Sequence, residues 1–369
     1  MDKRRRYEAS DSDEDGDENG DGLVKRHRPD YGSMSHTSFE LPASSYTVAW
    51  ICAIPCELAA ARAVLDETHP SLPDQPWHDT NHYTLGAIGR HNVVVACLPA
   101  SQYGTNNATN VLTNLTRTFP SIRKCLMVGV GGGVPSQAND IRLGDVVVGV
   151  RVMPYELSKV GTDGEVQHMG SALMPHPSLS TLLSTVRAKH ESELSRVPSI
   201  LREMFSSHSG YGHPNLPDRL FEASHSHVQC ESRSPCDGCD GSRVVPRRTR
   251  RSTDPHIHYG AIGSGDKLIK DGLKRDDLAQ KLGVMCFEME AAGLMGVLPC
   301  LPVRGICDYS DSHKNKDWQR YAAAAAAAYA RELLEIMPVV AREGLRHRPA
   351  RDLALSDGMF PLSGLIFCR

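Results

Sequence analysis

Apolar residues alternate between β-type runs and helical spacing over residues 45–340. The first run, 46–54, is almost continuously apolar, which is typical of a buried strand. Pro55 suits the first position of the helix that follows. The runs at 83–88 and 92–98 are joined by a short Gly-Arg-His segment and predict a β-hairpin. This alternation predicts a single α/β domain with a mixed, largely parallel sheet.

The later pattern is equally regular except in one region. It predicts helices at 105–118, about 178–206, 271–283, 289–295 and about 318–340. It predicts strands just before the glycine run 128–135 and at 140–153, 257–266, 284–290 and 301–306. Residues 208–255 are rich in Ser, Pro, Arg, His and Cys, and we expect an irregular surface insertion there. The charged segment 1–44 is expected to be disordered, and 341–369 has no steady period and stays unassigned.

Charge and composition narrow the class of protein. The formal net charge of −3 argues against nucleic acid as a partner, and no apolar run approaches the length of a membrane span. The 11 cysteines are scattered through apolar stretches, which fits reduced thiols inside a cell. We therefore expect a cytoplasmic protein. Basic clusters at 3–6 and 25–28 leave nuclear import as an alternative.

Four acidic residues stand where ligands usually bind in α/β proteins. Glu288 and Glu290 follow a strand-like run, and Asp308 ends the next one. Ligands bind outside the carboxyl ends of strands in such sheets, although surface carboxylates are the plainer interpretation. Glu57 lies in the first turn of a predicted helix, where the helix dipole favours an acid and where a general base could also face a cleft. Spacing alone leaves both readings of Glu57 open.

The glycine run 128–135 is predicted to follow a strand and to let backbone approach a ligand closely, or else to form a tight turn. Its spacing fits neither a Walker loop nor a dinucleotide-binding loop, which argues against a dehydrogenase. The segment Gly263–Asp266 presents the same choice between a turn and a ligand loop.

A cysteine and histidine cluster lies in the predicted insertion. The candidate zinc ligands are Cys230, Cys236, Cys239, His225 and His227. Only one CxxC is present and the spacing is irregular, so unpaired thiols are favoured. We accordingly expect no metal and no cofactor.

Taken in order, several motifs resemble the superfamily of purine nucleoside phosphorylases and nucleosidases, in its Pfs-type fungal branch often joined to NACHT or ankyrin regions. They are VAWICAIPCELAAARAVLDE, YTLGAIGRHNVVVACLP, LMVGVGGGVPS, DIRLGDVVV, IHYGAIGSGD, FEMEAAGLM and RGICDYSDSHKNKDWQRYAA. The resemblance implies a three-layer α/β/α sandwich around a central mixed, partly closed β-sheet. It also implies a purine nucleoside or nucleotide as the small-molecule partner, and a homo-oligomer.

The resemblance assigns roles to individual residues. Glu57 matches the acid that activates water, and Asp308 matches the acid that protonates purine N7. Glu290 matches the ligand of the ribose hydroxyls. The remaining substrate contacts expected from the resemblance are Met289 against the sugar, Glu288 as a supporting carboxylate, the backbone of Val130 and Gly131, and the backbone near Leu268 and Ile269. Asp308 would have to carry a proton, which burial among apolar residues favours.

Two departures from the family pattern matter. Phosphorolytic members place an Arg before the glycine loop and a Ser or Thr within it, where this chain has Met127 and Val130. Phosphate needs charge-assisted donors, so hydrolysis is the preferred expectation. An aromatic that stacks on the base in bacterial nucleosidases is replaced by Leu268. A phosphate-dependent phosphorylase and a purine-sensing signalling module with little turnover are the alternatives.

Overall fold

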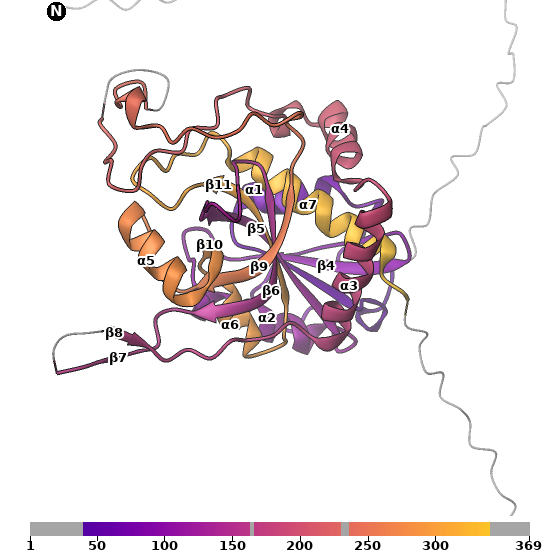
Figure 1. Ribbon diagram of the computed structural model, residues 1–369. Coiled ribbons are helices and arrows are strands. Elements are labelled where there is room, and N and C mark those ends of the chain that lie inside the picture. Colours follow the sequence, from indigo (N-terminus) through magenta and orange to yellow (C-terminus); the bar gives the residue numbers. More distant parts are fainter. Residues whose placement is uncertain (1–39, 163–165, 230–235, 340–369) are drawn as a thin grey trace, which may run out of the picture. The chain divides into compact units, whose positions relative to one another are not determined.

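The computed structural model describes residues 40–162, 166–229 and 236–339. Within them, nine strands form one mixed sheet in the order β10-β9-β6-β11-β5-β1-β4-β3-β2 (Figure 1). These strands are β1 (Val48–Cys52), β2 (Glu67–His69), β3 (Tyr83–Ile88), β4 (His91–Cys97), β5 (Lys124–Gly133), β6 (Val146–Pro154), β9 (Ile257–Ser264), β10 (Val284–Glu288) and β11 (Leu301–Asp308). A separate hairpin pairs β7 (Ser158–Val160) with β8 (Val166–His168).

Part of the sheet closes on itself. Strand β10 pairs in parallel with β9 and also antiparallel with β5, where Phe287 lies opposite Gly132. The strands β10, β9, β6, β11 and β5 therefore form a ring, from which β1, β4, β3 and β2 extend as an open arm. This confirms the expected mixed, partly closed sheet.

Helices cover both faces of the sheet and make the expected three layers (Figure 1). They are α1 (Pro55–Ala63), α2 (Thr105–Thr118), α3 (Pro177–Ser192), α4 (Val197–Ser207), α5 (Gly272–Leu282), α6 (Ala291–Met295) and α7 (Gln319–Ile336). One apolar core joins the sheet to α1, α3, α4 and α7, and a second core joins it to α2 and α6. Across the described residues, no helix is long and apolar enough to cross a membrane.

The alanine-rich helix α7 lies very close to the sheet. Its alanines from Ala322 to Ala328 are all buried, and Gly305 of β11 has no room for a Cβ because the Ala322 carbonyl would collide with it. Small side chains on both elements therefore allow helix and strand backbones to approach closely. This contact fixes the strand that ends at Asp308.

Several boundaries differ from the sequence expectations. The glycine run lies inside β5 rather than after it. Glycine is needed at Gly129 and Gly132, because the side chains of Glu57 and Ser310, respectively, occupy the space that a Cβ would take. The helical stretch 178–206 divides into α3 and α4. Short β2 and the β7–β8 hairpin were not expected, because three-residue strands carry too little alternation to detect.

The predicted insertion, 208–255, contains two 3₁₀ turns (Ser209–Tyr211 and Gly241–Arg243) and a bridge between Phe221 and Val244. The predicted tails lie outside the described residues except for 40–44, where a 3₁₀ turn (Ala43–Ser45) begins.

A candidate active site where four strands end

A cavity of about 1350 Å³ lies beside the ends of β1, β5, β10 and β11. The pairing of Gly132 with both Phe287 and Asp308 shows that three of these strand ends meet at one place. Six of the eight predicted site residues line this cavity: Glu57, Val130, Gly131, Glu288, Met289 and Glu290. Asp308 and Ile269 do not line it.

Glu57 is buried at the start of α1 and binds backbone on two sides. Its Oε2 accepts hydrogen bonds from the backbone N–H of Ala53 at 2.6 Å and of Ile54 at 3.2 Å, and its Oε1 accepts one from Val130 N–H at 2.8 Å. Burial raises the pKa of Glu57, and the charge of Arg304 and these N–H groups act in the opposite direction. Glu57 thus caps the helix and also lines the cavity, so the two readings of this residue are compatible.

Arg304 is the main residue of the site that the sequence reasoning did not single out. It is 1% exposed, forms an ion pair with Glu288, and its Nη2 lies 3.5 Å from Glu290 Oε2. Its Nη1 also donates to the Val130 carbonyl at 3.4 Å. Burial acts to lower the pKa of Arg304, but the surrounding carboxylates outweigh it and raise the pKa. An arginine inside an otherwise apolar run, LPVRGI, was the available signal, since a buried charge needs partners.

The two glutamates after β10 have different surroundings. Glu288 accepts hydrogen bonds from the backbone N–H of Glu290 and Ala291, and so caps the short helix α6. Glu290 lines the cavity, and its Oε1 accepts a 3.4 Å bond from Gly104 N–H. Burial raises the pKa of Glu290 to about 7, and Arg304 acts to lower it. A pKa of about 7 allows the charge of Glu290 to change near neutral pH.

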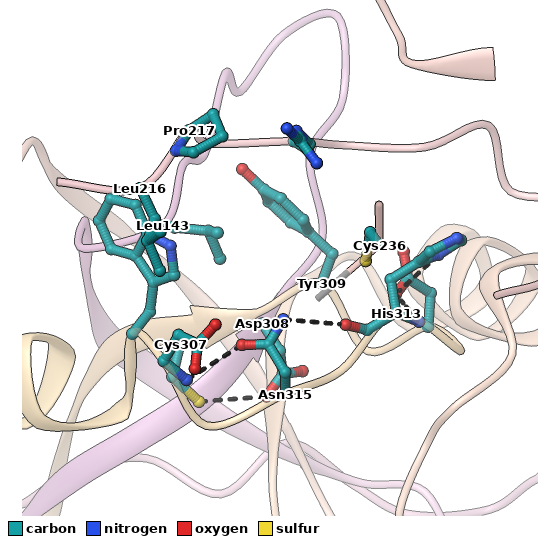
Figure 2. A pocket seen from close by; sticks show the side chains of 13 residues that line it. Leu143, Leu216, Pro217, Cys236, Cys307, Asp308, Tyr309, His313 and Asn315 are labelled. Atoms are coloured by element: carbon teal, nitrogen blue, oxygen red, sulfur yellow. Dashed lines mark hydrogen bonds and ion pairs between the residues drawn. The ribbon is translucent and has the colours of Figure 1, made fainter. Parts of the chain in front are cut away.

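Asp308 lies in a smaller cavity of about 60 Å³ that shares Cys307 and Asp317 with the large one (Figure 2). Its Oδ2 accepts a hydrogen bond from Lys314 Nζ at 2.6 Å, and its Oδ1 accepts one from Ser310 N–H at 2.9 Å. The thiol of Cys307 also donates to Oδ2 at 3.1 Å. Cys307 and Lys314 line the large cavity, so Asp308 is one side chain away from it.

The loop after β9 is held in place by side-chain contacts. Tyr155 Oη donates to the carbonyls of Gly265 and Lys267, and Asp266 accepts the backbone N–H of Thr105 at 2.7 Å. Asp266 therefore caps α2 from outside that helix. Leu268 lines the large cavity, whereas Ile269 packs against the apolar cluster around Tyr155.

Comparison with known proteins agrees with this architecture. The family model of the phosphorylase superfamily matches residues 47–335. The chain is 43% identical over 305 residues to a nucleotide-binding leucine-rich repeat (NLR)-like protein of Hyaloscypha variabilis, covering 80% of this chain and 30% of that protein. It is 26% identical to a 5′-methylthioadenosine/S-adenosylhomocysteine nucleosidase of Mycobacterium bovis, covering 80% of this chain and 98% of the relative.

Two further likenesses bear on the fold and on function. An Escherichia coli relative named ATP nucleosidase Cap17 is 25% identical, with 78% of this chain and 51% of that protein covered. The solved structure of an S-adenosylhomocysteine nucleosidase from Streptococcus pyogenes has a TM-score of 0.51 at 18% identity, covering 80% of this chain and 99% of that one. At that identity the likeness concerns the fold.

The architecture is that of an α/β protein whose mixed sheet closes into a ring, with acidic side chains where its strands end. The chain belongs to the phosphorylase superfamily, and its fungal NLR-like relative agrees with the fungal branch that the motifs indicated. Two of the relatives named above are called nucleosidases.

Proposed function

We propose that this protein hydrolyses the N-glycosidic bond of a purine nucleoside or nucleotide and releases the free base. The observation that carries the proposal is that Glu57 and Glu290 line one cavity, with Arg304 buried beside Glu290. Asp308 contacts Cys307 and Lys314, which line the same cavity. Each group has chemistry suited to one part of that reaction.

Glu57 is suited to the role of general base. Three backbone N–H bonds orient its carboxylate, and burial raises its pKa, which makes it a better proton acceptor near neutral pH. As the bond between C1′ and the base breaks, the water oxygen bonds to C1′ and Glu57 takes the water proton.

Glu290 is suited to hold the sugar. Its carboxylate lines the cavity next to Met289, while Arg304 and Gly104 N–H orient it from behind. A carboxylate at this place can accept the ribose hydroxyls and can stabilise positive charge that develops on the ring in an oxocarbenium-like transition state.

Asp308 is proposed as the acid that protonates purine N7, so that the base leaves neutral. In the arrangement described here its carboxylate binds the Lys314 ammonium group. The acid role therefore requires that substrate binding replace this contact at Asp308 and that Asp308 gain a proton. Its closeness to the cavity through Cys307 and Lys314 supports that assignment.

Water, rather than phosphate, is the proposed acceptor. Met127 is fully buried in the core and cannot contact a phosphate, and the N–H of Val130 is already donated to Glu57. Arg304 is bound by carboxylates. Near Glu57, Val130 and Arg304, an attacking phosphate dianion would therefore lack the charge-assisted hydrogen-bond donors that it needs.

A 5′-phosphorylated substrate is favoured by the cations along the cavity. Lys314, Lys316 and Arg320 line it together with the main-chain segment 209–214. Lysine and arginine are common phosphate ligands. The likeness to an ATP nucleosidase points the same way.

The alternative is a purine-sensing module with little turnover. The relative with 43% identity is NLR-like, and the chain spans only 30% of its length. In that case Asp308→Asn would leave purine affinity unchanged and no base release would be measurable from the native chain.

The deciding experiment incubates the purified chain with adenosine, 5′-methylthioadenosine and ATP, each with and without phosphate. Released base is measured by chromatography. We expect release without phosphate, fastest from ATP. Release that depends on phosphate would support a phosphorylase, and folded protein that releases no base from any of the three would overturn the proposal.

A further inference from the structure

Cysteine and histidine side chains from two distant parts of the chain meet beside the candidate acid. His225, His227, Cys236 and Cys239 belong to the insertion, and His313 belongs to the loop between β11 and α7. Two groups of potential metal ligands share Cys239: one adds His227 and Cys236, and the other adds His225 and His313. Within each group, all ligand atoms lie within 4.8 Å of one another.

The distances in the first group fit a tetrahedral metal site. The Nδ1 atom of His227 lies 3.3 Å from the Cys239 sulfur and 3.7 Å from the Cys236 sulfur. With zinc bonds of about 2.3 Å to sulfur and about 2.0–2.1 Å to nitrogen, neighbouring tetrahedral ligand atoms are roughly 3.3–3.8 Å apart. Both distances from His227 to sulfur therefore match two ligands of such a site, and the two sulfur atoms lie within 4.8 Å of each other.

The second group supplies nitrogen atoms that lack hydrogen-bond partners. Within the described chain, neither ring nitrogen of His313 accepts or donates a hydrogen bond, and Nε2 of His225 is also unpartnered. His313 is only 9% exposed, and its Nδ1 has Asp311 Oδ1 at 3.6 Å. Buried polar atoms are normally satisfied, and a metal ion would satisfy one of these nitrogens.

We propose that this cluster binds one zinc-type divalent transition metal through Cys236, Cys239, His227 and one imidazole of the pair His225 and His313. Two thiolates and two imidazoles in tetrahedral arrangement select zinc among common cellular metals. The site departs from the expectation of no metal, which considered only the spacing within the insertion. His313 was not recognisable as a candidate there, because it lies outside the insertion and reaches Cys239 only through the tertiary structure.

Contacts around the cluster support a structural role for the proposed metal ion. The backbone N–H of Val228 points at the Cys239 sulfur at 3.4 Å, as N–H groups do around metal-bound thiolates. The backbone N–H of His227 also donates to Ser312 Oγ at 2.9 Å. The bond to Ser312 joins the insertion to residues 309–317, the loop that contains Lys314, the partner of Asp308. With His313 as the fourth ligand, the metal would join the same two segments directly.

Figure 2 shows Cys236 and His313 beside Tyr309 in the smaller cavity that also contains Asp308. Zinc bound through His313 would therefore hold the loop next to the candidate acid in one position. The metal would not contact substrate, since none of its proposed ligands lines the large cavity.

The test measures metal directly. The full chain is purified without chelator in a thiol-free phosphine reductant, and its metal content is measured by mass spectrometry of the elements. We expect about one zinc per chain. The metal-free chain, prepared with chelator, is then titrated with Co²⁺. Tetrahedral d–d bands together with a thiolate-to-cobalt charge-transfer band are expected at one equivalent.

Variants locate the site. Cys239→Ala removes the ligand shared by both groups, and we expect zinc content to fall below one tenth and the charge-transfer band to disappear. Cys125→Ala, at a buried cysteine of the second core, is the matched control and should keep both signals. His313→Asn is compared with His225→Asn to find the fourth ligand, and exposed His78→Asn is the control.

The measurement on the native chain decides the proposal even if a variant fails to fold. Two results would overturn it: no stoichiometric metal together with no cobalt band, or full zinc content in folded Cys239→Ala. A disulfide between Cys236 and Cys239 in a second portion isolated without reductant, detected by intact mass, together with absence of zinc, would also overturn the proposal and indicate a redox pair. Because metal content is measured without substrate, these outcomes are independent of whether the protein proves to be a nucleosidase.

Discussion

Lys314 Nζ lies 2.6 Å from Asp308 Oδ2, so the loop after β11 supplies a cation to the acid at the end of that strand. Burial acts to lower the pKa of Lys314, but Asp308 and its neighbours outweigh burial and raise it. The same lysine lines the large cavity, where it can reach a bound ligand. Through this contact, the loop of residues 309–317, next to the proposed metal site, binds the residue that is proposed to protonate the leaving base.

If Asp308 is the acid, Asp308→Asn should lower kcat for base release by about 10²–10⁴-fold, because the leaving base loses its proton donor. Base release is measured by chromatography, and circular dichroism checks the fold. Exposed Asp74→Asn is the control and should be as active as the native chain. An Asp308→Asn variant that keeps more than a tenth of the activity would exclude this role.

Glu57→Gln should lower kcat/KM by about 10²–10⁴-fold, because an amide cannot accept the water proton. In the native chain kcat/KM should rise with pH on the acid side, since the base must be ionised. Burial raises the pKa of Glu57, so this rise should occur above the pH at which an ordinary glutamate ionises. The comparison uses pH–rate profiles, with exposed Glu67→Gln as control. A native profile without an acid limb would contradict the assignment.

Glu290 should make stability depend on pH. Its folded-state pKa of about 7 exceeds its ordinary value of 4.5, so between these values the folded chain binds more protons than the unfolded chain. The contribution of Glu290 to the free energy of unfolding therefore falls as pH rises through this window. The unfolding free energy of Glu290→Gln, relative to that of the native chain, should therefore increase by about 1–3 kcal/mol when the pH is raised from 5 to 8.

That change is read from urea unfolding at the two pH values. If the native and Glu290→Gln chains differ in unfolding free energy by the same amount at pH 5 and at pH 8, Glu290 does not titrate between these pH values. The same variant should raise KM, because the amide is a weaker ligand for ribose hydroxyls than a carboxylate.

Gly129→Ala tests how closely β5 approaches the site. The added Cβ would collide with the Glu57 carboxylate and lie 2.7 Å from Arg304 Nη1, both of them buried. We expect a loss of about 1–3 kcal/mol in unfolding free energy, with activity reduced further because Glu57 moves. Gly241→Ala has nothing within 4 Å of its Cβ and should change stability by less than about 0.5 kcal/mol. Equal effects of the two substitutions would contradict this packing.

Arg304→Met should be among the most damaging single changes. It leaves the buried carboxylates of Glu288 and Glu290 without their cation, which typically costs about 3–5 kcal/mol. Thermal unfolding of the native and variant chains measures the loss. The triple variant Arg304→Met, Glu288→Gln, Glu290→Gln should recover part of it, and a triple variant less stable than Arg304→Met would argue against charge as the cause.

Local sequence determined the alternation of strands and helices, the position of the insertion and the acids Glu57, Glu290 and Asp308, because periodicity and end-of-strand placement are properties of neighbouring residues. The resemblance of the ordered motifs also indicated the family. The pattern of apolar and polar residues could not show that β5 and β10 pair and close a ring. It also could not show that the glycine run forms a strand that packs against Glu57 and Asp308.

Only tertiary structure brought together groups that lie far apart along the chain. Arg304 forms its ion pairs with carboxylates of β10 and the turn after it, and Lys314 folds back onto Asp308. His313 meets Cys239 of the insertion although neither flanks the other in sequence. Such contacts arise from the packing of whole elements, and no local pattern encodes them. The acids and four candidate metal ligands were therefore visible in the sequence, whereas the counter-charges of the acids and the approach of His313 to those ligands were not.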